Sequence, residues 1–202
     1  EPSREMGLEL DSPFEDCFLG NFHYSMGEKV EGPMDFSKKN FMSIPDQHKF
    51  LIQLIFPNQN NSENQLSLSE LDQKFILSKM SMLPRHSTNP KYGAKYYDGY
   101  CKFFMFGDSK ARIPDHIKIF NKVGLAYGFV LDNAYIIDQK HGVEFFLTAV
   151  VYGNRNGVLN DNIYDYDNLT IPFLSVLGNA IYKYEKMREK KHAPDLSFFE
   201  QM

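Results

Sequence analysis

The segment Phe120–Gly128 (FNKVGLAYG) places Lys122 two residues before Gly124 in an otherwise largely apolar run. A glycine in a strand has no Cβ, so a ligand can approach the backbone closely, and the neighbouring lysine puts a cation beside that ligand. These residues could therefore bind a small molecule. The alternative is an exposed strand lysine, followed by a glycine that relieves a bend or bulge.

Residue patterns for nucleophilic catalysis are missing from the sequence. A serine is activated when a lysine three positions later lies one helical turn away, or when the serine sits in a G-x-S-x-G elbow. The sequence contains neither pattern, and its nearest approach, residues 37–40 (SKKN), ends in asparagine instead of lysine. The 202 residues therefore supply no Ser-Lys nucleophile of their own.

Histidines are the other residues that could do chemistry, and none has a metal-binding spacing. The six are His23, His48, His86, His116, His141 and His192, without an H-x-x-x-H or H-E-x-x-H pair. We therefore expect surface or structural histidines and no metal site. Residues 154–161 (NRNGVLND) lack the spaced carboxylates of an EF-hand loop and favour a turn over calcium binding. The sequence also contains no phosphate-binding glycine loop, so we expect the protein to bind no cofactor.

The composition and charge of the chain argue against some classes of function. The chain has a net charge of −4 and a pI near 5.9, which argues against nucleic acid as the partner, because phosphate binding needs a basic surface. No run approaches the roughly 20 apolar residues of a membrane span. Cys17 and Cys101 form no C-x-x-C motif; one bridge is possible, but two free thiols are favoured. The chain begins at Glu1 without a signal pattern, so we expect an upstream segment to have been removed.

The N-terminal half is expected to be irregular and then helical. Residues 1–42 show no sustained period and predict an irregular N-terminal segment. A helix should begin after Ser43, which can cap it, and a polar loop should follow at residues 57–65. A second helix is expected from Ser69 to Met82. Its predicted apolar face comprises Leu71, Phe75, Ile76, Leu77 and Met82.

The C-terminal half predicts a three-stranded antiparallel meander and a helix. The strands are expected at 117–123, 124–138 and 143–152, joined by short turns. The third strand is apolar on both faces, so helices should cover both faces of the sheet. The last helix should be capped by Thr170. Its predicted buried stripe comprises Phe173, Leu174, Leu177, Ile181 and Tyr184.

The motif around Lys122 resembles one in serine β-lactamases and penicillin-binding proteins. Those proteins carry Lys-Thr/Ser-Gly on an inner strand, followed by two antiparallel strands and a C-terminal helix, the order expected here. The longer pattern, from FNKVGLAYGF through DNAYIID and GVEFFLTAVVYGN to NDNIYDYDN and PFLSVLGNAIYKYE, is similar to bacterial envelope proteins related to class A β-lactamases. The upstream segments DFSKKN and MSMLPRHSTNPKY resemble the same branch.

This resemblance implies a site on the strand. Lys122 would take the catalytic electrostatic role and would act on the serine and on the substrate carboxylate. Val123 and Gly124 would be the substrate-binding residues, with Gly124 leaving room beside the strand. The chain departs from the family where Val123 replaces the Thr or Ser that would hydrogen-bond the carboxylate. The S-x-x-K and S-D-N elements of the family are also absent.

The resulting expectation is an α+β fold: an antiparallel sheet packed with a C-terminal helix (113–202), a helical lobe (43–112) and the irregular segment 1–42. Together they would form one β-lactamase-like domain, incomplete at its N-terminus. Two functions fit: part of a serine hydrolase acting on a β-lactam or peptide amide, or a non-catalytic envelope-binding module. By resemblance the location is the cell envelope or periplasm, with a small-molecule or peptidoglycan-like ligand. An open sheet edge could also pair two copies, unless residues 1–42 cover it.

Overall fold

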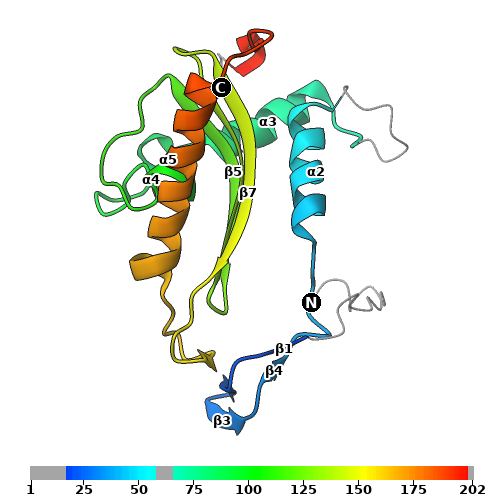
Figure 1. Cartoon of the computed structure of the whole chain (residues 1–202), viewed down its shortest axis with the longest axis vertical. Helices are drawn as coiled ribbons and strands as arrows, with labels where there is room; N and C mark the ends of the chain where they lie inside the picture. The colour runs from blue at the N-terminus through cyan, green and yellow to red at the C-terminus, as the bar shows by residue number, and fades with distance from the viewer. Residues whose placement is uncertain (1–16, 58–65, 200–202) are drawn as a thin grey trace.

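The computed structural model describes residues 17–57 and 66–199. A three-stranded sheet lies at the centre with helices on both faces, and a group of short strands lies at one end of the long axis (Figure 1). The elements, in chain order, are β1 (Phe18–Leu19), β2 (Phe22–Ser25), β3 (Glu28–Glu31), β4 (Met34–Asp35), α2 (Ile44–Ile55), α3 (Glu70–Ser81), η1 (Pro84–His86), α4 (Phe103–Phe106), β5 (Ile117–Ala126), β6 (Phe129–Asp138), β7 (Val143–Tyr152), β8 (Val158–Leu159), η2 (Tyr166–Thr170), α5 (Ile171–Met187) and η3 (Ser197–Phe199).

The main sheet is an antiparallel meander in the order β5-β6-β7, as the sequence predicts. The predicted boundary between its first two strands is wrong, because Gly124 pairs with Leu131 inside β5. The turn comes later, at Tyr127 and Gly128, with φ angles of 55° and 89°. A two-residue hairpin turn needs positive φ at these positions, and Gly128 adopts it without steric cost.

Helices cover both faces of this sheet, as the apolar third strand predicts. Helix α5 and the short α4 pack on one face with β5–β7 residues such as Ile119 and Ile136, whereas α2 and α3 pack on the other with Phe120 and Tyr135 (Figure 1). Alternation along β5 thus sends odd-numbered residues toward α4 and α5, and even-numbered residues toward α2 and α3. The buried side chains of β5 therefore belong to two separate cores.

The two long N-terminal helices begin where predicted. Ser43 and Ser69 cap α2 and α3, and each hydroxyl accepts a hydrogen bond from a backbone N–H three residues later. The predicted apolar face of α3 is correct for Leu77, which is buried, but wrong for Leu71 and Phe75, which are 80% and 63% exposed. The other buried residue of α3 is Gln73, which the prediction left out. Gln73 donates to two carbonyls at the end of α2 and so joins the two helices.

Helix α5 also differs in detail from its prediction. Thr170 occupies the N-cap position as predicted, but its hydroxyl makes no capping bond and donates instead to the carbonyls of Asp165 and Tyr166, at the start of η2. In the predicted stripe, Leu174 is fully buried, but Phe173 is 51% exposed and Tyr184 is 60% exposed. The buried face instead follows Leu174 and Gly178, one helical turn apart, where α5 meets α4.

Residues 17–42 are less irregular than predicted. They contain four short strands: β1 pairs with β4, and β2 pairs with β3. Strand β2 also pairs in parallel with β8, from the other end of the chain. None of these described strands pairs with β5 or β7, so residues 17–42 do not extend the main sheet. Most of the predicted polar loop and residues 1–16 lie outside the described residues.

The observed fold class is therefore mixed α+β with antiparallel sheets. Cys17 and Cys101, which both lie in the described part of the chain, are not joined by a disulfide. Among the described helices, none is both long enough and apolar enough to cross a membrane.

Candidate functional site

The three predicted site residues lie consecutively on β5, which is an edge strand of the main sheet. Lys122 is exposed, and its Nζ donates to the carbonyl of Val123 at 2.5 Å. Val123 is half-buried against the core beneath α4 and α5. A Cβ added at Gly124 would meet only the side chain of Leu131, at 3.8 Å. The lysine therefore faces solvent beside backbone that a ligand could approach, whereas the valine packs inward.

Beneath this surface lies a buried polar network centred on Asn121, the residue before Lys122. Its Oδ1 accepts a hydrogen bond from Lys102 Nζ at 2.6 Å, and its Nδ2 donates to Asp132 Oδ1 at 2.8 Å. Lys102 Nζ also donates to the Met80 carbonyl at 2.5 Å. The other Asp132 oxygen accepts from the backbone N–H of Phe104 at 3.1 Å. A lysine and an aspartate are thus joined through one asparagine in the interior.

Burial shifts both charged groups of this network toward neutrality. Burial lowers the pKa of Lys102 from 10.5 to about 8, although the nearby Asp132 and Cys101 oppose the shift. Burial raises the pKa of Asp132 from 3.8 to about 6. The hydrogen bonds from Asn121 and from the backbone N–H of Phe104, and the charge of Lys102, oppose this rise. Two side chains that titrate near neutral pH are a feature of sites that move protons, and they also occur in structural ion pairs.

Cys101 connects the buried network to the surface around Lys122. Its backbone carbonyl accepts a hydrogen bond from Asn121, and its backbone adopts a φ of 62°. Burial raises the pKa of the Cys101 thiol, and the charges of Lys102 and Lys122 act against that rise. The thiol is thus close enough to Lys122 to feel its charge, but the net shift favours the protonated, unreactive form.

A cluster of three tyrosines precedes Cys101 in the chain. The ring centroids of Tyr96 and Tyr100 are 4.8 Å apart, and Tyr92 lies 5.1 Å from Tyr96 and 5.8 Å from Tyr100. Tyr100 is exposed, so this cluster offers an aromatic surface in the same stretch of chain as Cys101. Aromatic rings of this kind provide large apolar contact area together with a polar hydroxyl.

Seven of the described serine hydroxyls donate structural hydrogen bonds. Four bond to carboxylates and three donate to backbone carbonyls; these residues are Ser43, Ser69, Ser175 and Ser197, and Ser78, Ser81 and Ser87, respectively. Thr148 lies 2.7 Å from Nδ1 of His48, but its hydroxyl donates its proton to Asn133. That proton is therefore not available to the histidine, and the group instead ties α2 to the sheet.

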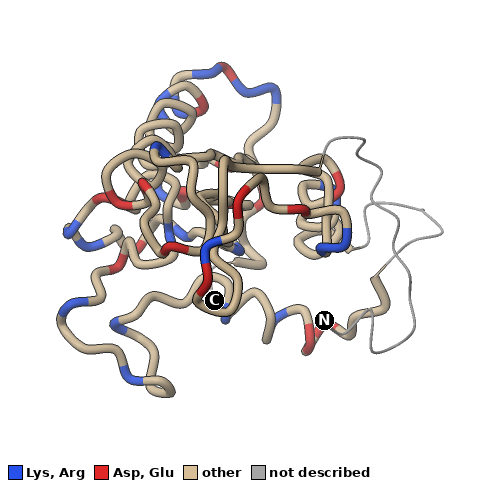
Figure 2. The backbone as a smooth tube through the Cα atoms, turned by 90° about the horizontal axis from the view of Figure 1, so that it is seen from below, with Lys and Arg blue, Asp and Glu red and all other residues tan. Residues whose placement is uncertain are grey.

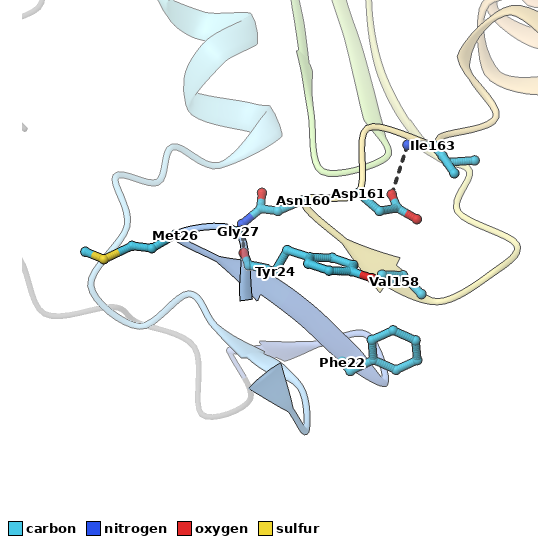
Figure 3. A pocket seen from close by; sticks show the side chains of 8 residues that line it. All are labelled: Phe22, Tyr24, Met26, Gly27, Val158, Asn160, Asp161 and Ile163. Carbon is cyan, nitrogen blue, oxygen red and sulfur yellow. Dashed lines mark hydrogen bonds between the residues drawn. The ribbon is translucent and has the colours of Figure 1, made fainter. Parts of the chain in front are cut away.

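Two hollows lie away from Lys122. The larger, of about 720 Å³, lies between β2 and the chain around β8 (Figure 3). Its lining residues are Phe22, Tyr24, Met26, Gly27, Val158, Asn160, Asp161 and Ile163. The smaller, of about 320 Å³, lies along the start of β5 beside the end of α3 and η1. Neither has Lys122 among its lining residues.

The residues that could hold a metal lie where β6 turns into β7, at the end of the main sheet remote from the turn between β5 and β6. His116, Asp138 and His141 bring one ligand atom each to within 4.8 Å of one another. The absence of a helical spacing between any two histidines predicted no metal site. Asp138 and His141 are nevertheless three positions apart, with Asp138 at the end of β6 and His141 in the turn that follows.

Charged residues are dispersed. Figure 2 shows Lys and Arg interspersed with Asp and Glu along the described backbone. The expectation that nucleic acid is not a partner stays a prediction. Comparisons with protein-family models, curated proteins and solved structures find no match to this chain. The function therefore has to be argued from the geometry and from the resemblance of the motif.

Proposed function

We propose that this chain is the C-terminal part of a β-lactamase-like serine hydrolase that acts on a β-lactam or a peptide amide. The observation that carries the proposal is the exposed amine of Lys122 on edge strand β5, at the start of a strand-strand-strand-helix order. The same resemblance would place the protein in the cell envelope or periplasm.

In this proposal Lys122 attracts the carboxylate of the substrate, and Gly124 lets the substrate lie close to the strand. A serine outside these 202 residues attacks the amide carbonyl, its proton passes to the departing amine, and water then hydrolyses the acyl-enzyme ester. An exposed lysine-carboxylate pair contributes about 1 kcal/mol or less, so the lysine alone would give no more than about a fivefold effect.

The test is covalent labelling of the protein encoded by the whole gene with a fluorescent penicillin. We expect a labelled band that unlabelled penicillin suppresses. Lys122→Met should slow labelling by about two- to fivefold, because the carboxylate loses its cation. Lys183→Met is the matched control, since Lys183 is an exposed lysine on α5, and its labelling rate should equal that of the wild type. Absence of labelling at every pH tested would contradict the hydrolase.

A second candidate is a non-catalytic module that binds an envelope peptide or glycan on the same strand. The inward packing of Val123 favours it, because the hydroxyl that the β-lactamase motif supplies is replaced here by a core contact. Soluble peptidoglycan fragments should then bind saturably without being consumed, measured by calorimetry and by chromatography of the recovered fragments. Consumption of the fragments would favour the hydrolase instead.

The proposal for a second copy of the chain concerns β7. Among the described strands, only β6 pairs with β7, so its outer edge has free backbone groups. Edges of this kind favour pairing with another strand. Homodimerisation through β7 stays a prediction, and sedimentation of the purified chain at several concentrations would test it.

A further inference from the structure

Three side chains converge where β6 turns into β7, at the end of the main sheet remote from the turn between β5 and β6. His116 directly precedes β5, Asp138 ends β6, and His141 lies in the turn before β7. Their ligand atoms come from three places in the sequence, and pairing of β5 with β6 brings the first two together. Asp138 is fully buried, whereas the histidines are at least partly exposed.

The carboxylate of Asp138 is fixed from several elements. Its Oδ2 accepts a hydrogen bond from the Tyr182 hydroxyl of α5 at 2.5 Å and lies 2.7 Å from His141 Nδ1. Its Oδ1 accepts from the backbone N–H of His141 at 3.1 Å. Hydrogen bonds of this kind from a second shell orient the carboxylates that bind metals. Strand, turn and helix thus hold the oxygen atoms in one orientation.

His116 faces this carboxylate without bonding to it. Its Nε2 lies 3.9 Å from Asp138 Oδ1, too far for a hydrogen bond, and its ring centroid is 5.9 Å from that of His141. Around a tetrahedral zinc ion with bonds of about 2.0 Å, neighbouring ligand atoms lie about 3.3 Å apart. The two separations involve different oxygens of Asp138: His141 Nδ1 lies 2.7 Å from Oδ2, and His116 Nε2 lies 3.9 Å from Oδ1, so one is shorter and the other longer than that value. Small rotations of the partly exposed imidazoles would meet it.

We propose that His116, Asp138 and His141 form a binding site for a single zinc ion. Two imidazoles and one carboxylate suit zinc and similar transition metals, whereas calcium and magnesium prefer oxygen ligands throughout. The fourth position would face solvent beside His141 and hold water. This site is independent of the proposed function, because Lys122 lies farther along β5, toward the other end of the strand.

The competing explanation is a histidine that merely hydrogen-bonds to a buried aspartate. That arrangement needs His141 and Tyr182, but it gives no role to the imidazole of His116. Zinc binding would depend equally on both histidines. The loss caused by substituting His116 therefore separates a metal site from a structural hydrogen bond.

The test is calorimetric titration of the metal-free chain with Zn²⁺ near neutral pH, with Ca²⁺ titrated in parallel. We expect one Zn²⁺ per chain and no measurable Ca²⁺ binding. His116→Ala and His141→Ala should each weaken Zn²⁺ binding by at least about tenfold, and Tyr182→Phe should weaken it by about tenfold through loss of the second-shell bond. The titration needs no activity assay.

His23→Ala is the matched control, because His23 lies on β2, at the far end of the molecule from this turn (Figure 1). Its Zn²⁺ affinity should equal that of the wild type. Circular dichroism of each variant establishes that the fold is retained. The proposal is overturned if the folded wild type binds no Zn²⁺, or if His116→Ala binds it as tightly as the wild type.

Discussion

At the scale of single residues, Lys102, Asn121 and Asp132 form a buried group that is joined by hydrogen bonds. Each charge is desolvated and is held by hydrogen bonds to neutral groups as well as by its partner. Removing one partner from such a pair typically costs about 3 to 5 kcal/mol, because the other charge is left buried and uncompensated. This network therefore holds the edge strand β5 to the segment that contains Cys101.

The pKa of Lys102 gives a signed prediction for pH. Burial lowers this pKa from 10.5 to about 8, so between these values the unfolded chain binds the proton more tightly than the folded protein. The contribution of Lys102 to the free energy of unfolding should therefore rise as the pH increases from about 8 toward 10.5. The raised pKa of Asp132 has its effect at lower pH. The contribution of Asp132 to the free energy of unfolding should fall as the pH increases from about 4 to about 6.

The measurement is urea unfolding of the wild type and of Lys102→Met at several pH values from 7.5 to about 10. The pKa values of Cys101 and Tyr100 are also raised in the folded protein, but both residues are present in both proteins. The difference in free energy of unfolding, wild type minus variant, should grow with pH. A difference that stays constant or shrinks would show that the buried amine is not desolvated as described.

At the scale of elements, the contact between α4 and α5 fixes one face of the sheet. Gly178 of α5 lies directly against the backbone of α4. Met105 of α4 has a φ of 68°, and its carbonyl accepts a hydrogen bond from Asn179 at 2.9 Å. An irregular turn of α4 is thus held by α5, and that turn also delivers the N–H of Phe104 to Asp132.

Gly178→Ala tests this contact, because the contact decides whether the substitution raises or lowers the free energy of unfolding. In an isolated helix the change would stabilise by about 1 kcal/mol. Here an added Cβ would lie 2.5 Å from the backbone nitrogen of Met105, so we expect a loss of about 1 to 3 kcal/mol in the free energy of unfolding. Gly93→Ala is the control, since its Cβ would meet nothing within 4 Å, and its effect should stay within about 0.5 kcal/mol. Stabilisation by Gly178→Ala would contradict the close contact.

These elements also show what the sequence can predict. The starts of α2 and α3 depend on capping bonds between residues three positions apart, and the bounds of β7 depend on its own apolar run. The local sequence was therefore sufficient to predict where these elements begin. The buried face of α3 depends on what lies opposite, and the packing leaves Leu71 exposed while it buries Gln73. Helical periodicity cannot distinguish these outcomes, because both faces carry apolar residues.

The candidate sites also differ in whether the sequence could predict them. Lys122 could be proposed because a motif surrounds it in the sequence. Lys102 and Asp132 are 30 positions apart in the numbering and meet only through strand pairing and the turn of α4. The approach of His116 to Asp138 likewise requires the register of β5 against β6. Contacts set by tertiary structure leave no fixed spacing for a motif search to find.

At the scale of the whole molecule, the short strands β1–β4 form a unit with few attachments. They lie at one end of the long axis, away from the main sheet (Figure 1). Their attachments to the chain around β8 include the pairing of β2 with β8, a bond from Asn21 N–H to the Gly157 carbonyl at 2.8 Å, and one from Asn160 Nδ2 to the Tyr24 carbonyl at 3.0 Å. Every residue of β3 is exposed, whereas the second half of β6 is buried throughout.

Hydrogen exchange should therefore distinguish two levels of stability. Amides in the centre of β6 are protected by packing on both faces and should exchange only through global unfolding, whereas amides of β2 and β3 should exchange at least about 100-fold faster. Asn160→Gly removes the bond to Tyr24 while tolerating the positive φ at that position, so it should accelerate exchange in β2 and leave β6 unchanged. Asn162→Gly is the control: Asn162 has the same φ of 61°, and exchange in β2 should remain at the wild-type rate. Equal protection of β2 and β6 in the wild type would mean that the short strands and the main sheet unfold as one cooperative unit.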